Sequence, residues 1–236
     1  MEKGLHYQLE VCANSVASAI AAQAGGADRV ECCQNLEIGG ITPSPGQIQM
    51  VRQQLSIGMH VLVRPRGGDF VYTDIEFEEM KADVLFCKEA GCDGVVIGLL
   101  DVEGRVDHKR TAELVALAAP LDVTFHRAFD VTSEPFEALE TVIGCGCRRL
   151  LTSGMKSTAM EGAELINELV KQSNGRIEIM PGAGINEANL ADIARITGAS
   201  SFHTSAKVVL RDRMGEKIWE SSKEKIRQLA DILKNL

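Results

Sequence analysis

Four segments of this 236-residue chain share one pattern, in which a glycine is followed by a small residue and then by the start of an apolar strand. The four glycines are Gly26, Gly91, Gly146 and Gly198. Glycine readily takes the left-handed conformation that ends a helix, and a small residue after it lets helix and strand approach closely. Because the segments precede every second strand of the predicted series, they indicate a pairwise repeat of strand–helix units.

A strand followed by a helical pattern occurs eight times along the chain. The predicted strands begin near His6, Asp28, Met59, Asp93, Leu121, Arg148, Arg176 and Ser200. We therefore predict an α/β fold, a closed (β/α)8 TIM-type barrel, in preference to a doubly wound sheet with similar turns. The length and the 45% hydrophobic content suit a single domain over residues 1–236 with its core at roughly 6–234.

Capping residues mark several helix starts. Ser44 and Thr73 begin capping patterns, and Ser133 and Asn186 stand just before two later helices. After the final predicted strand, which begins near Ser200, the last helical pattern is expected to start at Ser221 with Glu224.

Net charge and cysteine usage limit the partners. A formal charge of −8 and a pI near 5.2 argue against nucleic acid or an anionic membrane as the main partner. The N-terminus shows neither a secretory signal nor a long apolar span, so we expect a cytoplasmic protein. In that reducing compartment the seven cysteines are expected to be thiols or metal ligands rather than disulfides.

Polar side chains gather where the predicted strands end. The stretch from Val123 to Asp130 carries His126, Arg127 and Asp130 between a strand and the next helix. The carboxyl ends of parallel strands converge on one face, where sites are built. The other strand ends carry Glu10, Cys12, Glu31, Cys33, Arg64, Arg66, Thr152, Ser153 and His203.

Residues two apart along a strand share a face, which pairs Arg64 with Arg66 and places each glutamate beside a cysteine. This predicts a polar mouth that holds a small anion through Arg64 and Arg66. The candidate general acids and bases are Glu10, Glu31, His126 and Asp130, and the further substrate-binding candidates are Arg127, Thr152, Ser153 and His203. The alternative is a structural layer of ion pairs that only satisfies buried charge.

The glycine-containing loop after the seventh strand is a candidate phosphate site. Gly182 and Gly184 precede Asn186, the expected cap of the following helix, so free backbone N–H groups could bind phosphate. Alternatively, the two glycines only form a tight strand–helix turn.

Cys12 and Cys33 are expected to project from neighbouring strand ends on the same face as the glutamates. Two thiolates at short distance can bind a soft ion such as Cu(I). Alternatively, each cysteine is only a small core residue.

Several longer motifs are spread along the chain: Leu9–Cys12, Gly25–Glu31, Gly39–Ser44, Arg64–Phe70 with Tyr72, Thr124–Asp130, Leu151–Gly154 and Met180–Ile185. Together these motifs resemble the CutC family, which is associated with copper homeostasis. The resemblance runs from about Leu9 to Ser205 and implies a TIM-type barrel, a cytoplasmic location, a homo-oligomer and copper handling by cysteines. Cys12 and Cys33 match the positions of the copper-ligand cysteines proposed for that family.

Two functional hypotheses follow. The first is a cytoplasmic copper-binding protein of copper homeostasis, with Cu(I) held by Cys12 and Cys33. The second is a metal-independent barrel enzyme acting on a small phosphorylated or carboxylated compound, because the other polar strand-end residues are hard ligands that Cu(I) does not prefer. No reaction can be assigned from the sequence.

Overall fold

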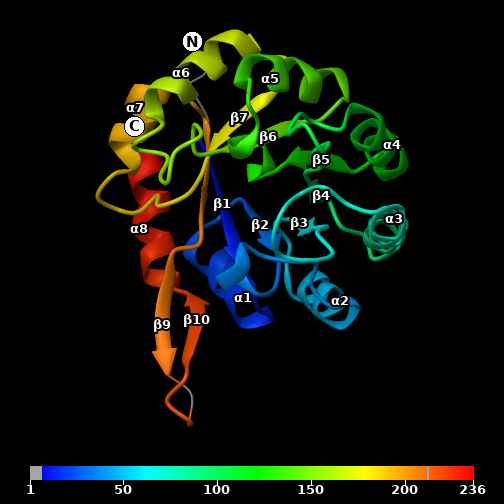
Figure 1. Ribbon diagram of the computed structural model, residues 1–236. Coiled ribbons are helices and arrows are strands. Elements are labelled where there is room, and N and C mark those ends of the chain that lie inside the picture. The colour runs from blue at the N-terminus through cyan, green and yellow to red at the C-terminus, as the bar shows by residue number, and fades with distance from the viewer. Residues whose placement is uncertain (1–6, 212) are drawn as a thin grey trace.

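The computed structural model describes residues 7–211 and 213–236. Within these residues, eight parallel strands alternate with helices and curve into a barrel (Figure 1). The strands are β1 (Gln8–Ala13), β2 (Arg29–Cys32), β3 (Gly58–Leu62), β4 (Gly94–Ile97), β5 (Asp122–Phe125), β6 (Arg149–Thr152), β7 (Glu178–Pro181) and β8 (Ser201–Thr204). The sheet order runs from β7 through β1 to β8, and β7 contacts β8 where the barrel closes. The predicted (β/α)8 barrel is confirmed, although His6, the expected start of the first strand, lies outside the described residues.

Helices form the outer ring of the barrel (Figure 1). They are α1 (Val16–Gly25), α2 (Pro45–Gln54), α3 (Asp74–Glu89), α4 (His108–Ala118), α5 (Pro135–Gly144), α6 (Ala163–Ser173), α7 (Leu190–Thr197) and α8 (Lys223–Lys234). Two short 3-10 turns, η1 (Leu36–Ile38) and η2 (Arg127–Val131), follow β2 and β5 among the residues described. No described helix is both long and apolar enough to span a membrane.

The four repeat glycines end or follow helices as predicted. Gly26, Gly91, Gly146 and Gly198 all have positive φ, between 69° and 96°. At the first of them, the backbone N–H of Gly26 bonds to carbonyls of the last turn of α1. In each repeat the small residue after the glycine begins the segment that leads to the next strand. The turn therefore allows the helix and the strand to pack closely.

Two of the predicted caps are confirmed and two are displaced. Ser44 caps α2, and Thr73 forms a complete capping box with Glu76 at the start of α3. The N-cap of α5 is the residue after Ser133, and that of α7 is three residues after Asn186. Asn186 instead closes a turn of its own by accepting a hydrogen bond from the N–H of Ala188, which delays the helix.

An antiparallel hairpin separates β8 from α8 and projects from the barrel (Figure 1). It consists of β9 (Lys207–Arg211) and β10 (Lys217–Ser221). This hairpin was not predicted from the sequence, although Val208, Val209 and Leu210 form a short apolar run in β9. The predicted last helix is present, and its N-cap is Ser222, one residue after the expected Ser221.

Candidate functional site

A cavity of about 810 Å³ opens at the C-terminal ends of the strands. Its polar lining includes Cys12, Glu31, Arg64, His126, Arg127, Asp130, His203, Lys207 and Lys225. Its apolar lining includes Leu36, Ile38, Leu62, Phe70, Val131, Leu151, Ile185 and Leu229. Polar residues from the ends of several strands therefore line one cavity, as the sequence predicted. The lining can also enclose part of a small organic molecule.

Cys12 and Cys33 contact each other at the inner edge of this cavity. Their sulfur atoms are 3.3 Å apart, and the two side chains come from the end of β1 and from the residue after β2. The hydrogen bond with Cys33, together with burial, raises the pKa of the Cys12 thiol well above its usual range. Both side chains are buried, and Cys12 lines the cavity.

His203 joins Cys12 and Glu31 in a compact group. One donor atom from each of the three lies within 4.8 Å of the others, the only such group of metal-ligand type among the residues described. The imidazole Nδ1 of His203 is 2.7 Å from Oε1 of Glu10, and its Nε2 is 3.7 Å from Oε2 of Glu31. The ring therefore has one nitrogen fixed by Glu10 and the other turned toward the cavity group.

The pKa values of this group respond to burial and to neighbouring charge. Burial opposes the charged form of His203, but the carboxylates of Glu31 and Glu10 outweigh it and raise the pKa of His203 well above its usual range. Burial also raises the pKa of Glu31, against the effect of His203. Burial and the neighbouring carboxylates thus act on His203 in opposite directions, and the carboxylates together have the larger effect on its pKa.

Beneath the cavity lies a set of paired charges that we call the ion-pair layer. It consists of Glu10, Arg29, His60, Asp122, Arg149 and Glu178. Arg29 Nε lies 2.5 Å from Oε2 of Glu10, and Arg149 is within 2.9 Å of two carboxylates. Burial opposes ionisation of Glu10, but Arg29 and His203 outweigh it and hold the pKa of Glu10 well below its usual range.

Glu10, proposed from the sequence as an acid or base, therefore belongs to the structural alternative. Its two oxygens are engaged by Arg29 and His203, and it is not among the described residues that line the cavity. Sequence analysis missed Arg29 and His60 altogether. Arg29 lies two positions before Glu31 on β2, so the strand alternation could have identified it.

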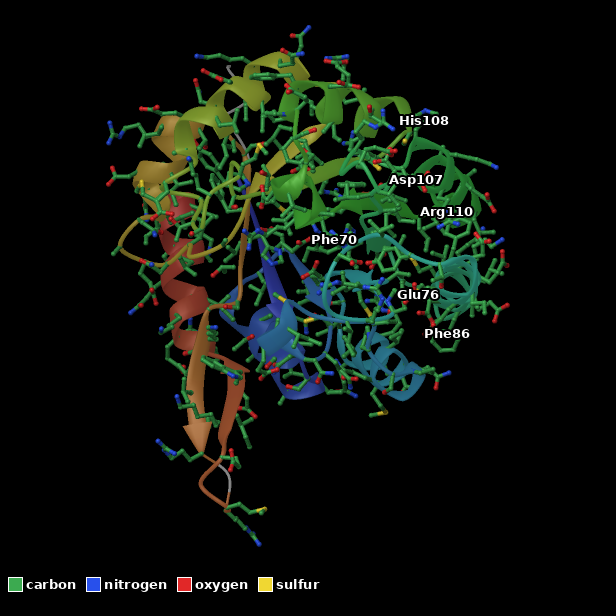
Figure 2. All side chains as sticks on the ribbon, in the orientation of Figure 1. Phe70, Glu76, Phe86, Asp107, His108 and Arg110 are labelled. Carbon is green, nitrogen blue, oxygen red and sulfur yellow. The ribbon has the colours of Figure 1, made fainter. Side chains whose placement is uncertain are left out.

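Arg64 and Arg66 do not act as a pair. Arg64 is 5% exposed and lines the cavity, whereas Arg66 lies outside it and pairs with Asp69 and Glu76 at 3.1 and 2.5 Å. Figure 2 shows Glu76 toward the outer helix α3 and Phe70 nearer the barrel. The expectation of a shared face does not hold because β3 ends at Leu62, and side-chain alternation applies only within a strand.

His126 is buried, and its ring lines the cavity. Nδ1 accepts a hydrogen bond of 3.1 Å from the backbone N–H of Ala128, and Nε2 has no partner among the residues described. Burial, together with the charge of Arg64, lowers the pKa of His126 to about 3. The imidazole is therefore neutral near neutral pH.

The carboxylate of Asp130 is bound by three residues that were predicted to bind a substrate. Thr152 Oγ1 donates to its carboxylate at 2.5 Å, Ser153 donates from both N and Oγ, and Arg127 pairs with it at 2.7 Å. The loop after β6 is thus organised around a carboxylate of the protein itself. Substrate binding by Thr152 and Ser153 would require displacement of these bonds.

The two glycines of the loop after β7 have different environments. The N–H of Gly182 donates to the carbonyl of Thr152 in the strand ladder, and a Cβ there would lie 2.5 Å from Leu151. Gly184 has φ 73° and lines the cavity. Gly182 therefore supports the tight-turn alternative, and Gly184 stays the candidate for ligand contact.

The family model for the CutC family matches residues 7–208. This chain belongs to the CutC family. It is 54% identical over 199 residues to the family protein CutC of Chromobacterium violaceum, which covers 84% of this chain and 81% of the relative. It is 49% identical over 201 residues to the human copper homeostasis protein cutC homolog, covering 85% of this chain and 74% of the relative.

Solved structures agree with this assignment. The CutC structure from Streptococcus agalactiae matches with a TM-score of 0.81 and 33% identity, covering 84% of this chain and 98% of that one. Thiamine phosphate pyrophosphorylase from Pyrococcus furiosus matches with a TM-score of 0.65 at 17% identity, over 97% and 96% of the two chains. The second likeness shows the shared barrel fold only. The resemblance to the CutC family found in the sequence is confirmed.

Proposed function

We propose that this CutC family protein functions in copper homeostasis by binding Cu(I) at Cys12 and Cys33. The observation that carries the proposal is the 3.3 Å contact between the two sulfur atoms at the cavity, beside His203. Thiolates are the ligands that Cu(I) prefers. The human and mouse relatives are named copper homeostasis protein cutC homolog, which supports the same function.

The donor set suits a soft ion. Cys12 and Cys33 would hold Cu(I) as thiolates, and their sulfur atoms already lie 3.3 Å apart. His203 would supply Nε2 as a further ligand, because Glu10 already fixes its Nδ1 in the arrangement common around metal-bound histidines. Glu31 is a hard ligand and contributes least to Cu(I) selectivity.

Anaerobic titration of the reduced, metal-free protein with Cu(I) against a competing chelator tests this proposal. We expect roughly stoichiometric uptake in the wild type, and its loss in Cys12→Ser/Cys33→Ser because no other described thiol pair lies beside His203. Cys145→Ser/Cys147→Ser is the matched control, because it removes two buried thiols elsewhere and should leave uptake unchanged. Equal uptake by both double variants would remove the Cys12–Cys33 site.

A cytoplasmic location and homo-oligomeric assembly are further parts of this proposal. All seven cysteines lie in the described part of the chain and are free thiols, as a reducing compartment favours. Assembly into a homo-oligomer stays a prediction from the family resemblance, which light scattering of the purified protein would measure.

The size of the cavity favours a second candidate function, that of a metal-independent enzyme for a small phosphorylated or carboxylated substrate. A volume of about 810 Å³ lies within the usual range for small-molecule sites and is far larger than one ion needs. Of the acid–base candidates from the sequence, Glu31, His126 and Asp130 line this space, and His203 lies beside Glu31. A ligand-induced rise in melting temperature in Cys12→Ser/Cys33→Ser would support this function, because that variant lacks the thiol pair.

A further inference from the structure

Arg64 is a buried cation without a buried anion beside it. Among the residues that the structure describes, no carboxylate lies within ion-pair distance of its guanidinium. Its Nη1 and Nη2 atoms donate instead to the backbone carbonyls of Ile38, Gly40 and Gly68, at 2.8 to 3.0 Å. Burying a charge without a counter-charge is costly, so this position favours an anion supplied from outside the chain.

His126 presents a second unused donor. Because Nδ1 accepts the N–H of Ala128, the single proton of the neutral ring is on Nε2. Nε2 is buried and has no hydrogen-bond partner in the described part of the chain, and the same is true of Nε of Arg64. Of the seven buried side-chain atoms without a partner among the described residues, only these two belong to residues that line the cavity, where a ligand can provide the acceptors.

Phe70 brings the two donors into one region of the cavity wall. The guanidinium carbon of Arg64 is 4.9 Å from the centroid of the Phe70 ring, and the ring of His126 is 5.0 Å from the same centroid. Phe70 is partly buried, and its position near the barrel mouth can be followed in Figure 2. All three residues line the cavity, next to the apolar side chains of Leu36 and Leu62.

We propose that Arg64 Nε and His126 Nε2 bind the carboxylate of a small organic acid, whose apolar part lies against Phe70, Leu36 and Leu62. Two N–H donors and one positive charge match the two oxygens and single charge of a carboxylate better than a phosphate dianion. Since both nitrogen atoms are shielded in this structure, binding includes a rotation of the Phe70 ring away from them. Leu36 and Leu62 also pack against Cys12 and Cys33, so the apolar part of the acid would lie beside the thiol pair, whereas the two donors come from residues outside the proposed copper ligands.

Arg66 provides an internal contrast. It belongs to the same loop and carries the same charge, but Asp69 and Glu76 neutralise it outside the cavity. A site defined by charge alone would involve Arg66 as well, whereas a site defined by unsatisfied buried donors involves Arg64 and His126 only.

Calorimetry on the metal-free protein tests the proposal with three acids, propanoate, 4-methylpentanoate and 3-phenylpropanoate, each beside its neutral amide. We expect the best acid to bind at least about tenfold more tightly than its amide, because the amide cannot neutralise Arg64. His126→Phe and Arg64→Lys should each weaken acid binding by about tenfold, whereas Arg66→Lys should not. The titrations use metal-free protein, which separates this test from that of the copper site, and Cys145→Ser/Cys147→Ser, whose residues do not line the cavity, should bind the acid normally.

A measurement on the wild type does not depend on whether the variants fold. In nitrogen-15 spectra of the wild type, the Nε2–H signal of His126 should shift with the acid and not with its amide. The proposal is overturned if all three acids and their amides behave alike, if Arg66→Lys weakens binding as much as Arg64→Lys, or if the acid binds without moving the His126 signal.

Discussion

The barrel interior holds two groups of buried charges that differ in how they are satisfied. In the ion-pair layer, Arg29 meets Glu10, and Arg149 meets two carboxylates. At the cavity above it, the guanidinium of Arg64 donates to backbone carbonyls and lies over the Phe70 ring, with no carboxylate in reach among the described residues. Both groups contain buried nitrogen atoms without a hydrogen-bond partner in the described part of the chain, so the difference between them lies in charge. The ion-pair layer supplies its own counter-charges, whereas Arg64 has none from the described chain.

The largest effect is expected where the ion-pair layer is broken. Arg29→Met should lower the free energy of unfolding by about 3–5 kcal/mol, because Glu10 would remain buried without its main counter-charge. Urea unfolding measures this change. Arg176→Met is the matched control, since its pair with Glu140 is exposed and should leave the midpoint close to that of the wild type. Equal midpoints for the two variants would contradict a structural role of the layer.

Two glycines of β4 and its following turn distinguish the layer from the cavity. A Cβ at Gly94 would lie 2.6 Å from His60 and 2.8 Å from a backbone oxygen, so Gly94→Ala should lower the free energy of unfolding by about 1–3 kcal/mol. A Cβ at Gly98 would lie 2.3 Å from the ring of His126 and 2.9 Å from the Cβ of Ala128. Gly98→Ala should therefore also lower the free energy of unfolding and, by displacing the His126 ring, abolish binding of the organic acid, whereas Gly94→Ala should leave that binding in place. Urea unfolding and calorimetry of both variants measure the two effects.

The neutral His126 predicts a pH dependence of stability. Its pKa is lowered from 6.5 to about 3 in the folded protein, mainly by burial and further by Arg64. Between these values the unfolded state binds the proton that the folded state excludes. His126 should thus reduce stability by about 1.4 kcal/mol for each pH unit below 6.5, with the loss ending near pH 3.

Urea unfolding of the wild type and of His126→Phe at several pH values measures this contribution. The variant should show a shallower loss of stability on acidification. His60, whose pKa is lowered to about 4 chiefly by burial, remains in both proteins and contributes equally to each. Parallel pH profiles would mean that His126 has the same pKa in the folded and unfolded states, and would contradict the lowered pKa of the buried ring.

The smallest effect is expected outside the barrel interior. Arg66→Met removes ion pairs with Asp69 and Glu76 that are open to solvent, so the unfolding midpoint should stay within experimental error of the wild type. A clear loss of stability would show that the loop after β3 depends on Arg66 as well as on Arg64.

The sequence by itself determined the barrel fold and the position of the site at the C-terminal ends of the strands. Left-handed glycines, capping residues and strand alternation are local signals that act over a few positions, and Gly26, Thr73 and their equivalents behave as those rules require. The meeting of Cys12 and Cys33 followed from the same reasoning, because neighbouring parallel strands end at one edge.

Only the tertiary structure decided which charges are paired. The stagger of the strands brings Glu10 to His203, which is 193 residues away, and to Arg29 rather than to the arginines after β3. It also turns Arg64 inward and Arg66 outward once the strand has ended. Counter-charges and hydrogen-bond partners depend on distances across the closed barrel, and local sequence rules do not encode those distances.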